Sequence, residues 1–179
     1  NHDISSGLDT AFINSAINSN LAYRPEFVSN DYTQGKKVSV AIERELRHCD
    51  AFYISVAFIT EGGLAPLKQV LAELRDKGIP GKILTTSYLT FTEPKALKTL
   101  ANLSNVEVRV YDSTDEGASG FHTKGYIFKE EEIYRFIVGS SNMTASAFSV
   151  NKEWNTKLVS TSDGELLKQM MTEFNALWN

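Results

Sequence analysis

Apolar residues recur along the chain with two spacings, and the alternation of these spacings predicts an α/β domain. A first helix is expected over residues 36–49, where four apolar side chains share one face, at Val38, Ile42, Leu46 and Cys49. The next segment, residues 51–58, is a short apolar run of strand-forming residues, as in a buried strand. Helical spacing returns after Gly62-Gly63 and is expected to stop at Gly78.

The remaining segments continue this alternation. Five further strands are expected, at residues 82–86, 106–111, 121–129, 133–139 and 153–160. Three further helices are expected, over residues 8–19, from Thr92-Glu93-Pro94 through Leu100, and after a capping box made by Ser162 and Glu165. Glu130-Glu131-Glu132 connects two of the strands as a hairpin would, whereas residues 112–120 form a polar loop.

The order of these elements predicts an α/β fold with a mixed, largely parallel sheet flanked by helices. All 179 residues are expected to form one domain. Residues 1–33 would form an N-terminal helix and an irregular arm, and residues 34–179 the α/β core. Because the chain begins with Asn rather than Met, we expect it to be a piece of a longer protein.

Composition adds limits on location and partners. An apolar share of 42% and a charged share of 22% suit a globular domain with a real core. No apolar run reaches the length of a membrane span and no signal peptide is recognisable, so no membrane partner is expected. The single cysteine, Cys49, fits a cytoplasmic location and is expected to be a small apolar residue. The net charge of −4 disfavours strong independent binding to DNA, because basic residues supply most of that affinity.

One stretch carries the polar side chains that suggest chemistry. His122 and Lys124 alternate on a predicted strand, so both should leave one face about 7 Å apart. The next strand ends in Gly139-Ser140-Ser141-Asn142, where the glycine permits a tight turn. Taken alone, each of these residue types more often has a structural role. Only their joint arrangement favours a binding or catalytic site. If the strands are neighbours, the set suits a tetrahedral oxyanion bound by Lys124, Ser140, Ser141 and Asn142.

His122-Thr123-Lys124 followed by Gly139-Ser140-Ser141-Asn142 resembles the signature of the phospholipase D superfamily, a His-x-Lys with a downstream Gly-Ser-x-Asn. Four longer segments are similar to the phospholipase D-like domain at the amino end of certain bacterial superfamily-two helicases, namely residues 55–60, 92–97, 121–126 and 139–144. Two features depart from the signature. Lys129 stands where the superfamily has an aspartate, and the Gly-Ser-x-Asn arrives three residues later than the strict spacing.

The resemblance implies a phosphodiesterase that needs neither metal nor cofactor. It implies that His122 attacks phosphorus and forms a transient phosphohistidine, while Lys124 and Asn142 hold the non-bridging oxygens. Glu153, eleven residues after Asn142, would orient the imidazole. Neither His2 nor His48 lies in a second His-x-Lys. The resemblance therefore also implies a homodimer, formed through the His122 face, with two copies of His122 across one pocket.

Two functions remain open from the sequence. The first is a nuclease that acts on DNA rather than RNA or lipid. The chain contains no phosphate-binding P-loop, so the motor of an attached helicase would lie beyond Asn179. The second is a catalytically degenerate module that binds nucleic acid or a protein and positions the helicase. Lys129 and the acidic balance favour the second, whereas the complete set His122, Lys124, Asn142 and Glu153 favours the first. We favour the nuclease.

Overall fold

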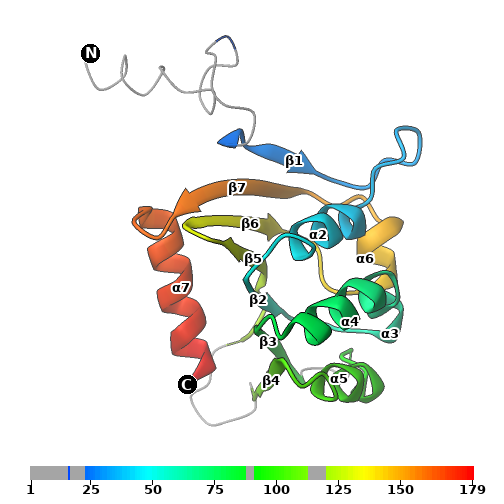
Figure 1. Ribbon diagram of the computed structural model, residues 1–179. Helices are drawn as coiled ribbons and strands as arrows, with labels where there is room; N and C mark the ends of the chain where they lie inside the picture. Colours follow the sequence, from blue (N-terminus) through cyan, green and yellow to red (C-terminus); the bar gives the residue numbers. More distant parts are fainter. Residues whose placement is uncertain (1–15, 17–22, 88–90, 113–119) are drawn as a thin grey trace.

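The structure is a computed structural model that describes Ala16 and residues 23–87, 91–112 and 120–179. The helix expected over residues 8–19 lies outside these ranges except for Ala16, and so does most of the polar loop expected over residues 112–120. The described part of the chain forms one sheet with helices on both faces (Figure 1).

Seven strands form this sheet in the order β1-β7-β6-β5-β2-β3-β4. They are β1 (Glu26–Val28), β2 (Ala51–Val56), β3 (Gly81–Thr86), β4 (Val106–Tyr111), β5 (Lys124–Glu130), β6 (Ile133–Gly139) and β7 (Asn155–Thr161). The neighbours β2, β3 and β4 are parallel, whereas the four pairings from β1 across to β2 are antiparallel. The α/β class and the mixed sheet are confirmed, and the parallel part is smaller than the sequence suggested.

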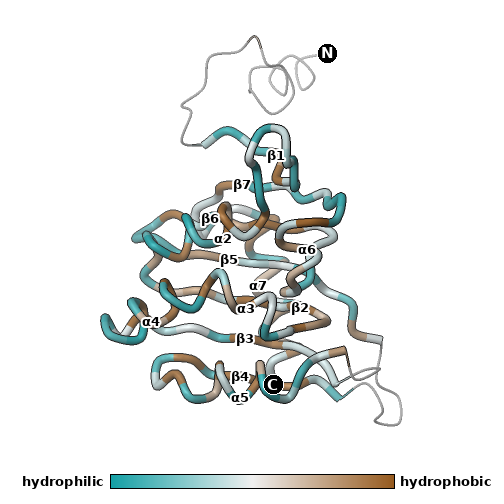
Figure 2. Tube along the Cα trace, turned by 90° about the vertical axis from the view of Figure 1, so that its right-hand side faces the viewer, coloured by the Kyte–Doolittle hydropathy of each residue, from teal (hydrophilic) through white to brown (hydrophobic). Residues whose placement is uncertain are grey.

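Most helices cover one face of the sheet, and a single long helix covers the other (Figure 1). The first group is α2 (Val38–Leu46), α3 (Glu61–Leu64), the 3-10 turn η2 (Ala65–Leu67), α4 (Lys68–Lys77), α5 (Pro94–Ala101) and α6 (Ala145–Ser149). The helix on the opposite face is α7 (Glu165–Trp178). Figure 2 shows hydrophobic and hydrophilic positions alternating along the helices, as expected when one side of each packs on the sheet.

Alternation along β2 creates two cores, one on each face of the sheet. Phe52, Ile54 and Val56 are buried in the larger core with residues of α2 and α4. Tyr53 points the other way and packs edge-to-face on Phe174 of α7, with ring centroids 5.7 Å apart. Each fully buried side chain of this size contributes about 1.5–3 kcal/mol, so the two cores fix the position of β2 in the sheet.

The sequence predicted the end of α4 correctly and the cap at the start of α7 incorrectly. Gly78 ends α4 as predicted, and its φ of 68° is a left-handed conformation that glycine adopts at no steric cost. The capping box predicted at Ser162 and Glu165 is wrong. Gly164 is the residue that precedes α7, so Glu165 is the first helical residue, and no side chain caps the helix.

Two strands begin later than predicted, and one strand was not predicted. β5 begins at Lys124 rather than residue 121, because its partner β2 ends at Val56, opposite Lys124. β7 begins at Asn155, two residues later than expected. The sequence did not predict β1, whose three residues pair antiparallel with β7 at the edge of the sheet. A strand this short shows too little alternation to be recognised from its own sequence.

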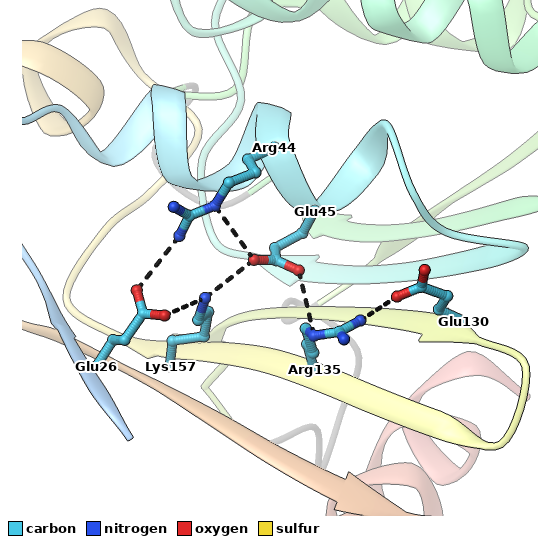
Figure 3. Close-up of polar contacts among 6 residues, drawn as sticks. All are labelled: Glu26, Arg44, Glu45, Glu130, Arg135 and Lys157. Carbon is cyan, nitrogen blue, oxygen red and sulfur yellow. Dashed lines mark hydrogen bonds and ion pairs between the residues drawn. The ribbon is translucent and has the colours of Figure 1, made fainter. Parts of the chain in front are cut away.

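A network of charged residues fastens α2 to the strands beneath it, formed by Glu26, Arg44, Glu45, Glu130, Arg135 and Lys157 (Figure 3). Lys157 Nζ of β7 lies 3.1 Å from Glu45 Oε1 and 2.7 Å from Glu26 Oε1. Lys157 and Glu45 are both buried. A buried charge is tolerated only beside a partner, so this network holds α2 against β1 and β7 in one position.

Candidate functional site

The predicted site residues lie at one end of the sheet. The register aligns Val28, Asn155 and Gly139 of β1, β7 and β6, and it aligns Lys124 of β5 with Val56 of β2. The pair Gly125–Val138 joins β5 to β6 next to both sets, so together they form a row across this end of the sheet. His122 comes two residues before this row in the chain, and Ser140 to Asn142 come directly after it. Because neighbouring strands here are antiparallel, these segments leave the row at the same end of the sheet. The sequence-predicted residues are therefore brought together.

His122 and Lys124 are in direct contact. Lys124 Nζ lies 2.9 Å from Nδ1 and 3.2 Å from Nε2 of His122, and it donates to the His122 carbonyl oxygen at 3.1 Å. His122 lies ahead of β5 rather than on the strand, and the lysine side chain folds back toward it. Burial lowers the pKa of Lys124, and the negative charge of Glu153 opposes this effect in part.

The side-chain amide of Asn142 is oriented by the main chain at the end of β2. Its Oδ1 accepts the Phe58 N–H at 3.1 Å. A backbone N–H can only donate, so the oxygen must face Phe58 and the amide N–H groups remain as donors. A parallel bridge between Ile59 and Met143 holds the two segments together, with Thr60 N–H donating to the Met143 carbonyl at 3.0 Å.

The two serines are turned toward Glu153 rather than toward His122. Ser140 Oγ donates to Glu153 Oε2 and accepts the Trp154 N–H at 3.1 Å. Ser141 Oγ donates to the same carboxylate oxygen at 3.3 Å, and its side chain is fully buried. The phosphate-binding role predicted for Ser141 does not fit this arrangement. No hydrogen bond joins Glu153 to His122 in the described structure, so the predicted contact between them is absent here.

Two buried residues that the prediction missed support the turn after β6. Asn155 Nδ2 donates to Ser141 Oγ at 2.9 Å and to the Val28 carbonyl at 3.1 Å. The hydroxyl of Tyr126 donates to the Ser141 carbonyl at 3.0 Å, and burial raises the pKa of this tyrosine well above its ordinary value. Alternation could have found Asn155, because it lies two residues from Glu153 and therefore faces the same way.

Gly139 lets β6 and β7 approach closely where the turn begins. A Cβ atom at this position would lie 2.1 Å from the Trp154 carbonyl oxygen and 2.6 Å from the Asn155 Cα. These are backbone atoms of the neighbouring segment, which a side chain at this position would displace. Glycine is therefore required for the hydrogen bonds that position Ser140 and Ser141.

Lys129, which stands where the superfamily signature has an aspartate, lies far from this site. It belongs to β5, five residues beyond Lys124, a separation of about 17 Å along a strand. Its backbone carbonyl accepts the Asp50 N–H at 2.7 Å, and its strand partners are Ala51 and Tyr134. The departure at Lys129 therefore does not alter the surroundings of His122.

The arrangement presents an imidazole, an ammonium and an amide donor at one end of the sheet, a set suited to a phosphate group. Among the described residues, no three histidine, cysteine or acidic side chains gather as a metal-binding group.

In the described ranges, no helix is both long enough and apolar enough to cross a membrane.

Comparison with known proteins agrees with this geometry. The family profile described as "Cardiolipin synthase, PLD-like domain" matches residues 47–178, a range that contains His122, Lys124, Asn142 and Glu153. No curated protein matches the chain at a significant level.

Several solved structures share the fold at low sequence identity. NucT from Helicobacter pylori is 15% identical with a TM-score of 0.66, over 87% of this chain and 96% of that chain. Phosphatidylserine synthase from Haemophilus influenzae is 14% identical with a TM-score of 0.62, over 97% and 44%. Yeast tyrosyl-DNA phosphodiesterase is 13% identical with a TM-score of 0.55, over 85% and 38%. At these identities the likeness shows a common fold.

Proposed function

The chain belongs to the family of phospholipase D-like domains, and from this premise we propose that it is a phosphodiesterase of the nuclease type that acts on DNA. The contact between His122 and Lys124, beside the oriented amide of Asn142, is the observation that carries the proposal. The names of two structural relatives include tyrosyl-DNA phosphodiesterase and phosphatidylserine synthase, so the fold alone does not choose between nucleic acid and lipid. The resemblance to helicase-linked domains favours DNA.

In the proposed mechanism, a ring nitrogen of neutral His122 forms a bond to phosphorus and the bond to the leaving oxygen breaks. A second imidazole gives its proton to that oxygen. Water then attacks the phosphohistidine, the nitrogen–phosphorus bond breaks, and the second imidazole recovers a proton. Lys124 and the Asn142 amide hold the non-bridging oxygens as charge develops on them. Ser140 is a weaker phosphate ligand, because its hydroxyl proton is already donated to Glu153.

A homodimer through the His122 face would supply the second imidazole. Within the described residues, the other histidine is His48, which follows α2 near Asp50. Asp50 N–H bonds to the Lys129 carbonyl, at the end of β5 away from His122. His48 therefore lies too far from the site to donate the proton. A two-fold pair that brings a second His122 to the same phosphate meets this need.

The setting in the parent protein is also part of the proposal. We propose one phospholipase D-like domain over residues 1–179, in which the core over residues 34–179 is extended by β1 from the preceding segment. An ATP-dependent helicase would follow it in the parent chain, and the protein would work in the cytoplasm. What supports the helicase link is the similarity of residues 121–126 and 139–144 to helicase-linked domains.

A second candidate function is binding without cleavage. The observation that favours it is the position of Glu153, whose carboxylate binds Ser140 and Ser141 rather than the imidazole of His122. Among the described residues, the His122 ring contacts Lys124 and the Phe58 ring. In that case the same surface would bind a phosphate backbone and position an attached enzyme.

Cleavage in EDTA separates these two functions. The chain should be incubated with plasmid and single-stranded DNA in EDTA, beside His122→Asn as the matched variant on an exposed position. We expect the wild type to cut and the variant to remain folded and inactive. DNA with a labelled phosphate, quenched in base, should leave label on the wild type alone. Cutting that requires magnesium, or that survives His122→Asn, would refute the mechanism, and binding without any cutting would support the second candidate.

A further inference from the structure

Two pairs of aromatic side chains flank the His122–Lys124 contact. Trp154 is 76% exposed and Phe27 65% exposed, and their rings meet edge-to-face with centroids 6.0 Å apart. On the other side, Phe91 is 55% exposed and packs on Phe58 at 5.0 Å, and the Phe58 ring lies 6.3 Å from the His122 imidazole. Exposed aromatic residues that gather around a polar site indicate a ligand-binding surface rather than core packing.

The strand order places one pair on each side of the phosphate site. Trp154 directly precedes Asn155 of β7, which lies two strands from Lys124, and Phe58 follows β2, which lies one strand away in the other direction. With strands about 4.8 Å apart, the two pairs are separated by about 14 Å across the end of the sheet. Trp154 N–H bonds to Ser140 Oγ at 3.1 Å, so the main chain that carries this ring is tied to the turn after β6.

The surface beside Phe58 and Phe91 suits a flat, mainly apolar group. These two rings line an open groove of about 500 Å3, and one of them, Phe58, is the ring that lies 6.3 Å from the His122 imidazole. Thr60, Thr144 and Ser146 also line it. Among the described lining residues the only charged one is Glu93, so a phosphate would be repelled. A nucleobase has a flat apolar face and polar edges and matches this lining.

We propose that a single strand of nucleic acid lies across this end of the sheet, with bases stacked on Trp154–Phe27 and on Phe58–Phe91. This inference rests on the proposed function, which places the scissile phosphate between the two pairs at His122 and Lys124. Base faces are available to protein rings only in an unpaired strand. A stacked strand advances about 3.4 Å per nucleotide, so the 14 Å span takes up to about four nucleotides. Stacking also supplies affinity that a chain of net charge −4 cannot draw from phosphate contacts alone.

The test compares base stacking with phosphate binding in the same protein. Binding of labelled oligo(dT) and of an abasic strand of equal length should be measured by fluorescence anisotropy in the His122→Asn background. We expect Trp154→Ala and Phe91→Ala each to weaken oligo(dT) binding by about 5- to 150-fold and to leave abasic binding unchanged. Val110→Ala is the control, because Val110 is an exposed apolar residue on β4, at the opposite edge of the sheet.

Intrinsic fluorescence gives a second readout. The chain has two tryptophans, and Trp178 is only 5% exposed, so quenching by oligo(dT) should come from Trp154 and vanish in Trp154→Ala. Equal binding of oligo(dT) by Trp154→Ala, Phe91→Ala and Val110→Ala would overturn the inference, even if His122-dependent cleavage is found. A response of Trp154 to phosphatidylglycerol vesicles with none to oligo(dT) would also overturn it. Stacking in a protein that does not cut would uphold the inference and remove the proposed catalysis.

Discussion

The amide of Asn142 is oriented before any ligand arrives, because Phe58 N–H holds its oxygen. Lys124 is held in a comparable way by the carbonyl of His122. Donors that are already in place need no reorganisation when charge develops on a phosphate, which is the main source of their value in a transition state. The residues behind them, Tyr126 and Asn155, contact the turn but not the phosphate position. At the scale of single residues, the site is thus a small set of donors on a rigid support.

Lys124→Ala and Asn142→Ala should each slow cleavage, because each removes one donor to the non-bridging oxygens. The loss of a preorganised donor costs about 2.7–4 kcal/mol in the transition state, or about 100- to 1000-fold in rate. Asn142→Ala should also cost about 1 kcal/mol of stability, since the Phe58 N–H loses its acceptor. Steady-state kinetics, vanadate binding and urea unfolding measure these effects. Large losses of stability with unchanged vanadate affinity would mean that both residues are structural.

As the pH is raised, the rate of cleavage should fall at a lower pH than expected for a lysine with an ordinary pKa. Burial lowers the pKa of Lys124, so at a given alkaline pH a larger fraction of this side chain has lost its proton and its charge. An arginine keeps its charge throughout this range, so Lys124→Arg should move the loss of activity to higher pH. Profiles of kcat/KM against pH for both proteins test this. The same alkaline loss in Lys124→Arg would assign it to another group.

At the scale of elements, the ion pairs of the network in Figure 3 hold α2 on the strands beneath it. Lys157→Ala should destabilise the fold by about 3–5 kcal/mol, because it leaves the buried Glu45 without its nearest cation. The matched control is Arg75→Ala, which breaks an exposed pair with Asp76 and should cost about 1 kcal/mol or less. Urea unfolding measures both. Equal effects would show that the buried pair contributes no more than a surface one.

The same network should make stability depend on pH in acid. Burial tends to raise the pKa of Glu26, but the hydrogen bonds and charges of Lys157 and Arg44 together outweigh it, and the pKa is lowered overall. A carboxyl whose pKa is lower in the folded chain stabilises the fold above its unfolded pKa. That stability is lost as the pH falls through the folded value. Glu26→Gln should therefore reduce the change in unfolding free energy over this acid range. An unchanged acid profile would exclude Glu26 as a contributor.

The helices and long strands could be predicted because each has one face of apolar residues that packs on the core. Val38, Ile42 and Leu46 are buried on one side of α2, as their spacing indicates. The same local pattern could not show which way Glu153 turns. That depends on the pairing of β7 with β6, which sets Asn155 opposite Gly139 and brings the carboxylate to Ser140. β1 was missed for a similar reason, since its structure comes from β7 rather than from its own three residues.

At the scale of the whole molecule, one chain contributes half of the proposed catalytic pair. We expect a homodimer of about twice 19.9 kDa in sedimentation at micromolar concentration. Mixing the inactive His122→Asn variant with the wild type should reduce activity by more than the dilution of the wild-type chains accounts for. The reason is that a mixed dimer has only one His122 imidazole at its shared site. Activity in strict proportion to the wild-type chains would show that each chain works alone.

The row of residues across the end of the sheet has a consequence for how the chain folds. The bond from Asn155 to the Val28 carbonyl joins positions 127 apart in sequence, and that from Asn142 to Phe58 joins positions 84 apart. Contacts of such long range close large loops, so they form late and together rather than one by one. During synthesis, a ribosome must deliver the whole segment through Asn155 before the turn that carries Asn142 acquires its full support. A nuclease built in this way would remain inert while it is still being made.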